Sequence, residues 1–235
     1  MVTKESRMII RKLQRPDKIS PIANHINSEI DRYGLTKMLE IGSDLGLLVE
    51  SIHINSIFAV DPVRNYKIPF KFRHIKFFEV TSDEFFKNSS EDFDLIYIDG
   101  LHTYEQSFND LINSMGRLRS GGPSLIYLDD VLPNDEFSCL ENPYDTFEGR
   151  KKLHGHLNDL SWMGSVYKII PLLAECDLSY STLNLDGKYV TRIKFGQSNN
   201  SNIVDLKRKL LAAKKSLNLE NFSFKEINLD QYKFI

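Results

Sequence analysis

Two runs of sequence decide the fold: FDLIYIDGLHTYE at residues 93–105 and SLIYLDDVLP at residues 124–133. Each contains an apolar run that stops at aspartate, and runs of this length favour strands buried on both faces of a parallel sheet. A helical pattern lies between them, so the unit is strand–helix–strand. Since such crossovers are nearly always right-handed, both strands end at one edge of the sheet, where open α/β sheets bind ligands. The side chains that we expect to converge there are Asp99, Asp129, Asp130 and His102.

The composition is that of an ordinary globular α/β domain. The chain has 235 residues, of which 41% are hydrophobic, and its formal net charge of −2 gives no sign of a nucleic-acid partner. Cys139 and Cys176 show neither metal spacing nor a disulfide pattern. No apolar run approaches the roughly 20 residues that span a bilayer, and the charged N-terminus is unlike a secretory signal. We therefore expect a cytoplasmic protein with no nucleic-acid or membrane partner.

The first half of the chain predicts a ligand-binding turn. Ser20-Pro21 is typical of a helix start, and isoleucines recur every four residues until Gly34. A strand then runs into the glycine turn of EIGSDLG at residues 40–46, after which we expect a helix. The next strand, residues 56–60, ends at Asp61, about 20 residues after the turn, where nucleotide-binding units place the acid that meets ribose hydroxyls.

The rest of the chain predicts further strands and a long loop. Residues 75–80 favour a third strand, and TSD at residues 81–83 starts a helix. Residues 132–157 are predicted to be an active-site loop, partly helical near 147–157. The runs on either side of Asp186-Gly187 predict a β-hairpin. A helix near 203–217 and an extended end at 222–235 complete the chain.

These motifs, in this order, resemble class I S-adenosylmethionine (SAM)-dependent methyltransferases. The closest subgroup includes macrocin O-methyltransferase-like and cephalosporin-hydroxylase-like proteins, and the resemblance covers about residues 35–195. It implies a Rossmann-like, seven-stranded, mostly parallel sheet with a C-terminal antiparallel hairpin and helices on both faces. The domains expected are an N-terminal arm and helix (1–34), the methyltransferase domain (35–197) and a C-terminal helix and tail (198–235).

The resemblance also implies roles for individual residues. Those implied to line SAM are Glu40, Gly42, Ser43, Gly46, Asp61, Ser82, Asp83 and Asp99. Those matching divalent-metal carboxylates are Asp99, Asp129 and Asp130. Asp99 and His102 are the implied catalytic residues, with His102 as general base. Two positions depart from the family pattern: Asp44 replaces the usual middle glycine of the turn, and Ser165 stands where the subgroup often has Asp.

The chemistry expected from this set is metal-assisted O-methylation. A hydroxyl is a poor nucleophile until it loses its proton, and an oxygen-ligated cation lowers that cost. Carboxylates without thiolates suit Mg²⁺, and a histidine can take the proton near neutral pH. We expect a sugar, a phenol or another small natural-product-like acceptor, and terminal helices that serve as homodimer contacts.

Other interpretations remain open at the level of sequence. Asp61 can be a helix cap, Asp129-Asp130 can be turn residues, and an isolated histidine is more often a structural hydrogen bonder. The alternative functions are a fold relative that uses the site for another reaction, a non-catalytic binding protein and an NAD-dependent oxidoreductase. The last is disfavoured because the turn lacks Gly-x-Gly-x-x-Gly.

Overall fold

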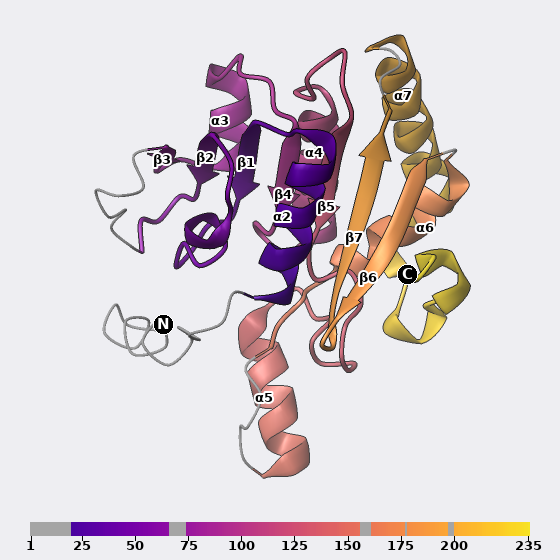
Figure 1. The fold of residues 1–235 in the computed structure, drawn as a ribbon. Helices are drawn as coiled ribbons and strands as arrows, with labels where there is room; N and C mark the ends of the chain where they lie inside the picture. The colour runs from indigo at the N-terminus through magenta and orange to yellow at the C-terminus, as the bar shows by residue number, and fades with distance from the viewer. Residues whose placement is uncertain (1–19, 66–73, 156–160, 177, 197–199) are drawn as a thin grey trace.

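The computed structural model describes residues 20–65, 74–155, 161–176, 178–196 and 200–235, and its strands form a seven-stranded sheet in the order β3-β2-β1-β4-β5-β7-β6 (Figure 1). The parallel strands are β1 (Lys37–Ile41), β2 (Ser56–Val60), β3 (Ile75–Phe78), β4 (Leu95–Ile98) and β5 (Ser124–Leu128). The antiparallel strands are β6 (Ser179–Leu185) and β7 (Lys188–Phe195). The predicted fold class is confirmed. The expected arm at residues 1–19 lies outside the described residues.

Helices cover both faces of this sheet. The helices are α2 (Pro21–Tyr33), α3 (Ser82–Asn88), α4 (Tyr104–Met115), α5 (Pro143–His154), α6 (Ile169–Glu175) and α7 (Asn200–Leu217). The predicted caps are confirmed: the Ser20 hydroxyl accepts from the backbone N–H of Ala23, and Gly34 ends α2 in the left-handed region at φ 64°. Thr81 and Glu84 form a complete capping box on α3. Among the described helices, none is both long and apolar enough to cross a membrane.

The strand β4 shows how the two cores arise. Its side chains alternate between the sheet faces, so that Leu95 and Tyr97 join the core under α2, whereas Ile96 and Ile98 join the core under α4. All four strand residues are buried. This explains why the sequence run is apolar at every position, since a strand buried on both faces has no polar side.

Three predicted elements differ from the structure. The helix expected after the glycine turn is only a 3₁₀ turn, Val49–Ser51, because the connector between Gly46 and Ser56 is shorter than a full helical crossover requires. The helix in the long loop begins earlier than predicted and is α5. The extended end at 222–235 instead forms the 3₁₀ turns Phe224–Glu226 and Leu229–Tyr232, followed by a bridge from Phe234 to β6.

The register of the sheet brings several chain segments to one edge. Ile98 pairs with both Ile41 and Leu128, so the residues that follow β1, β4 and β5 emerge together. Strand β7 is antiparallel and pairs Thr191 with Leu128, which brings its first residue, Lys188, to the same edge. Helix α5 projects beyond this end of the sheet, where the β6–β7 turn also lies (Figure 1).

Candidate active site

The glycine turn after β1 is packed directly against the residue that follows β4. Gly42 adopts φ 83°, and a Cβ added there would lie 1.9 Å from the backbone oxygen of Asp99. Gly46 has φ 70°, and its N–H donates to the Ser43 carbonyl at 2.6 Å. Only glycine fits the first position, because L side chains rarely adopt that φ and no space exists for a Cβ. The turn and Asp99 therefore form one unit.

The departure at Asp44 is accommodated by the residues after β2. Its backbone N–H donates to Asp61 Oδ2 at 2.9 Å, and its own Oδ1 accepts from Asn65 Nδ2 at 2.6 Å. Asp61 Oδ1 also accepts from the Val63 N–H at 2.8 Å. The Asp44 carboxylate is thus drawn toward Asn65, and Asp61 ties the two loops together at the place expected for a ribose-binding acid.

Glu40 lies beneath the turn and is 3% exposed. Its Oε2 has no hydrogen-bond partner within the described part of the chain. Burial, followed by the charges of Asp99 and Asp61, raises the pKa of Glu40 well above its usual range. An unpaired buried carboxyl oxygen beside a glycine turn marks a place where a polar ligand group could be bound.

Ser82 and Asp83 stand at the start of α3, next to α4. The Gln106 side-chain amide donates to Ser82 Oγ at 3.2 Å and to Asp83 Oδ1 at 3.3 Å. The same amide reaches Asp110 Oδ1 at 3.1 Å. Gln106 therefore fixes the start of α3 relative to α4, and Asp110, which shares this amide, lies close to Gly100, because a Cβ added at Gly100 would be 3.4 Å from Asp110 Oδ2.

Asp99, His102 and Asp130 form the central cluster of the site. One ligand atom from each of the three lies within 4.8 Å of the others. His102 Nε2 is 3.4 Å from Asp99 Oδ1, and its Nδ1 is 3.1 Å from Asp130 Oδ2. Since both ring nitrogens face oxygen acceptors, this arrangement suits the doubly protonated imidazolium.

The electrostatics of the cluster are strongly coupled. Burial opposes the charge of His102, but hydrogen bonding and attraction to Asp99, with Asp130 and Asp129 nearby, raise its pKa to about 9. Burial and repulsion by Asp129 and Asp99 raise the pKa of Asp130 to about 8. For Asp99 the contact with His102 outweighs burial and lowers the pKa. Perturbed groups gathered at one strand edge are typical of a functional site.

Asp129 lies next to this cluster but has other partners. Its side chain is 1% exposed; Oδ2 accepts from the Tyr97 hydroxyl at 2.6 Å and lies 2.5 Å from Lys188 Nζ. Its Oδ1 accepts from the Asp130 N–H at 2.9 Å. The structure thus brings Asp99, Asp130 and His102 together, whereas the Asp129 carboxylate is occupied by a phenol, an ammonium and a backbone amide.

Trp162 forms a wall against His102. The two rings are stacked, with centroids 4.8 Å apart and 11° between their planes, and His102 Nδ1 is also 3.1 Å from the Trp162 carbonyl. Behind them, Gly164 adopts φ 61°, and a Cβ there would lie 1.8 Å from the His102 carbonyl oxygen. The ring of His102 is therefore held between two carboxylates and an indole.

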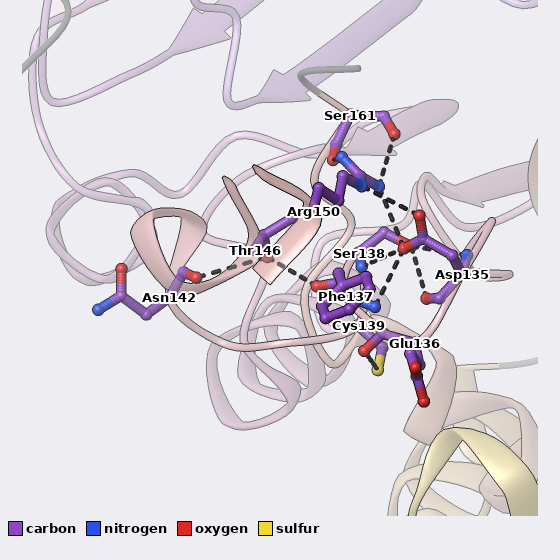
Figure 2. A network of polar contacts seen from close by, with 9 residues as sticks. All are labelled: Asp135, Glu136, Phe137, Ser138, Cys139, Asn142, Thr146, Arg150 and Ser161. Carbon is purple, nitrogen blue, oxygen red and sulfur yellow. Dashed lines mark hydrogen bonds and ion pairs between the residues drawn. The ribbon is translucent and has the colours of Figure 1, made fainter. Parts of the chain in front are cut away.

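The position of Trp162 depends on the long loop and α5. Arg150, which is 2% exposed, contacts Asp135 at 3.0 Å and donates to the Ser161 carbonyl at 2.6 Å (Figure 2). The N–H groups of Met163 and Gly164 donate to the Ser138 carbonyl. This network connects α5 through the loop to the segment that carries Trp162.

The contacts of Ser165 explain how a serine replaces the aspartate that the family pattern often has at this position. Its hydroxyl oxygen accepts from the Tyr104 N–H at 2.7 Å, at the first turn of α4, and the hydroxyl donates to Glu141 Oε1 at 2.7 Å. Ser165 and Glu141 together therefore supply the acceptor for the helix start and the negative charge that a single aspartate would bring.

Three residues of the site were not identified from the sequence: Lys188, Arg150 and Glu141. For Lys188 a signal existed, because it follows the predicted Asp186-Gly187 turn and antiparallel pairing brings that turn to the aspartate edge. The others come from the loop at 132–165, whose sequence has no periodicity from which their contacts could be predicted.

Comparison with known proteins agrees with this geometry. Residues 39–131 match the family model described as a methyltransferase domain. The sequence matches none of the curated proteins with which it was compared. A candidate O-methyltransferase from Klebsiella pneumoniae has a similar structure, with TM-score 0.50 and 13% identity over 83% of this chain and 88% of that one.

Two further solved structures bear ligands. The cofactor-bound protein Rv0187 from MTB has TM-score 0.50 and 11% identity, covering 83% of this chain and 89% of that one. An O-methyltransferase from Bacillus cereus in complex with SAH has TM-score 0.45 and 14% identity, covering 81% and 89%. The structural likeness at TM-score 0.50 establishes the fold that the resemblance implied.

Proposed function

We propose that the chain is a class I methyltransferase that transfers the methyl group of SAM to a hydroxyl oxygen of a small acceptor with the help of a divalent cation. The match of residues 39–131 to a methyltransferase domain and the order of the seven-stranded sheet support this proposal. The observation that carries the proposal is the direct packing of the Gly42 turn on Asp99, the residue shared by turn and cluster. The name of the similar structure from Klebsiella pneumoniae, a candidate O-methyltransferase, supports oxygen as the acceptor atom.

The residues around the turn fit SAM. Gly42, Ser43 and Gly46 would line its methionine and ribose parts, because a turn without side chains admits close approach. Asp61 would accept from the ribose hydroxyls. The unpaired oxygen of Glu40 lies beneath the turn and offers an acceptor for polar groups of the cofactor. Ser82 and Asp83, held by Gln106, would border the adenine.

The cluster fits a hard divalent cation. Asp99 and Asp130 supply carboxylate oxygens within reach of one another, and oxygen ligands without thiolate suit Mg²⁺. We assign direct ligation to these two residues; Asp129 supports Asp130 through the hydrogen bond to its N–H. A divalent cation bound there would orient the acceptor oxygen and offset the negative charges of Asp99 and Asp130, which contribute to the raised pKa of His102.

His102 is the proposed general base. Its Nε2 makes the longer of the two carboxylate contacts, 3.4 Å to Asp99, and is the atom that would accept the hydroxyl proton when the ring is neutral. SAM would supply the methyl group as an activated sulfonium and would leave as a neutral thioether, while the hydroxyl proton would remain on His102. Trp162 and the Asp130 contact hold the ring in place for this transfer.

The direct test combines binding and turnover. Titration calorimetry with SAM and S-adenosylhomocysteine should detect binding, and tritiated methyl transfer should be found with some members of a panel of sugars, vicinal diols and phenols. EDTA should abolish transfer and Mg²⁺ should restore it. Absence of SAM and S-adenosylhomocysteine binding would refute the methyltransferase proposal, and transfer that is indifferent to EDTA would refute its metal part.

A further inference from the structure

Lys188 places a positive charge beside the proposed cation site. It is the first residue of β7, and its Nζ lies 2.5 Å from Asp129 Oδ2. The Lys188 side chain is 46% exposed, whereas that of Asp129 is 1% exposed. The ammonium therefore sits at the boundary between solvent and a buried carboxylate, and it covers the oxygen through which Asp129 could bind a ligand.

The β-hairpin fixes Lys188 at this position. Asp186 and Gly187 both adopt positive φ, 56° and 87°, and the Asn184 side chain accepts from the Gly187 N–H at 3.1 Å. Pairing of β7 with β5 then brings the end of the turn to the edge where Asp129 emerges. A lysine elsewhere on a flexible loop would reach this carboxylate only transiently, but here the backbone is already in place.

Three donors already contact the carboxylate of Asp129. Tyr97 and Lys188 share Oδ2, and the Asp130 N–H occupies Oδ1. An incoming cation therefore finds two open carboxylates instead of three. It also meets the charge of Lys188, which acts on Asp99 and Asp130 as well as on Asp129.

We propose that the ammonium of Lys188 prevents Asp129 from serving as a ligand of the divalent cation. As a result, Asp99 and Asp130 bind the cation weakly and exchangeably. The inference rests on the proposed function, since it concerns the cation site of that function. Lys188 is a positioning residue that acts through Asp129. Removal of its charge frees Asp129 Oδ2 as a third anionic ligand and removes a repulsion from the cation.

The experiment measures cation binding directly, without turnover. Mn²⁺ serves as the probe, and its dissociation constant is determined by electron paramagnetic resonance for wild type, Lys188→Met, Lys188→Arg and Lys194→Met. Lys194 is the matched control, because it lies on the same strand and its Nζ contacts the Tyr33 hydroxyl at 2.9 Å, away from the cluster. We expect Lys188→Met to bind Mn²⁺ at least about tenfold more tightly, and both other variants to stay within about threefold of wild type.

The outcomes separate this inference from the proposal on which it rests. Equal affinity in wild type and Lys188→Met, or weaker affinity in the variant, overturns the role of Lys188 and leaves the cation site standing. If neither protein binds Mn²⁺, the metal part of the proposed function fails and the inference fails with it. Should Lys188→Met not fold, Lys188→Leu replaces it, since this side chain also lacks the charge and the donor and leaves Asp129 Oδ2 free, and the same tightening is expected.

Discussion

Asp110 allows a quantitative test of the packing between α3 and α4. Its side chain lies in the interior and the residue is 1% exposed. One carboxyl oxygen accepts from Gln106 at 3.1 Å, while Oδ2 has no hydrogen-bond partner among the described residues. Burial raises its pKa from 3.8 to about 6, although hydrogen bonds from Ser82 and Gln106 offset part of this effect. Ionisation of Asp110 therefore destabilises the folded state.

The sign and size of this destabilisation follow from the difference between the pKa values of Asp110 in the folded and unfolded states. Because the folded-state pKa is above the unfolded one, the folded state binds the extra proton between pH 4 and 6, and stability falls as the pH rises through that window. The difference of about 2.2 pKa units, at about 1.36 kcal/mol each, corresponds to about 3 kcal/mol. We expect Asp110→Asn to be more stable than wild type by about 3 kcal/mol at pH 7.5 and by about 1 kcal/mol at pH 4.5.

Urea unfolding at both pH values measures these differences. The control is Asp92→Asn, which makes the same chemical change at an exposed position and should alter the free energy of unfolding by less than about 0.5 kcal/mol. A destabilised Asp110→Asn protein at pH 7.5, or a gain in stability that does not depend on pH, would refute the argument that Asp110 is buried without sufficient hydrogen bonding.

Three further predictions concern the site. Gly42→Ala should abolish S-adenosylhomocysteine binding in calorimetry, because its Cβ would overlap the Asp99 backbone oxygen, whereas Gly121→Ala, with open space at the same kind of φ, should bind normally. His102→Gln should lower the rate of methyl transfer by about 10²- to 10⁴-fold while leaving S-adenosylhomocysteine binding within about twofold. Arg150→Met should lower the free energy of unfolding by about 2–4 kcal/mol and increase the fluorescence response of Trp162 to an added quencher; an unchanged response would show that the network does not position the indole.

The sequence was most informative where burial imposes a strict pattern. The strands β4 and β5 are buried on both faces, so their apolar runs and terminal aspartates could be recognised directly, and right-handed crossover then predicts one common edge. The glycine turn could also be predicted from the sequence, because no other residue fits at Gly42 and the glycine is therefore required there. The lengths of the elements were less predictable. The helix expected after this turn is a single 3₁₀ turn, because apolar periodicity does not determine how many residues of the connector become helical.

The different roles of the aspartates could not be predicted from the sequence, and the reason is physical. Asp129 and Asp130 are adjacent, and nothing in the string DD distinguishes them. They differ because Asp130 adopts φ 57°, which turns its carboxylate toward His102, while Asp129 remains in line with β5 and points to Tyr97 and Lys188. The role of a carboxylate depends on the donors that contact it. The side-chain donors to Asp129 are Tyr97 of β4 and Lys188 of β7, and Lys188 is almost sixty residues further along the chain. The local motif therefore predicts that acids gather at this edge, and only the strand pairing decides which of them remains open to a cation.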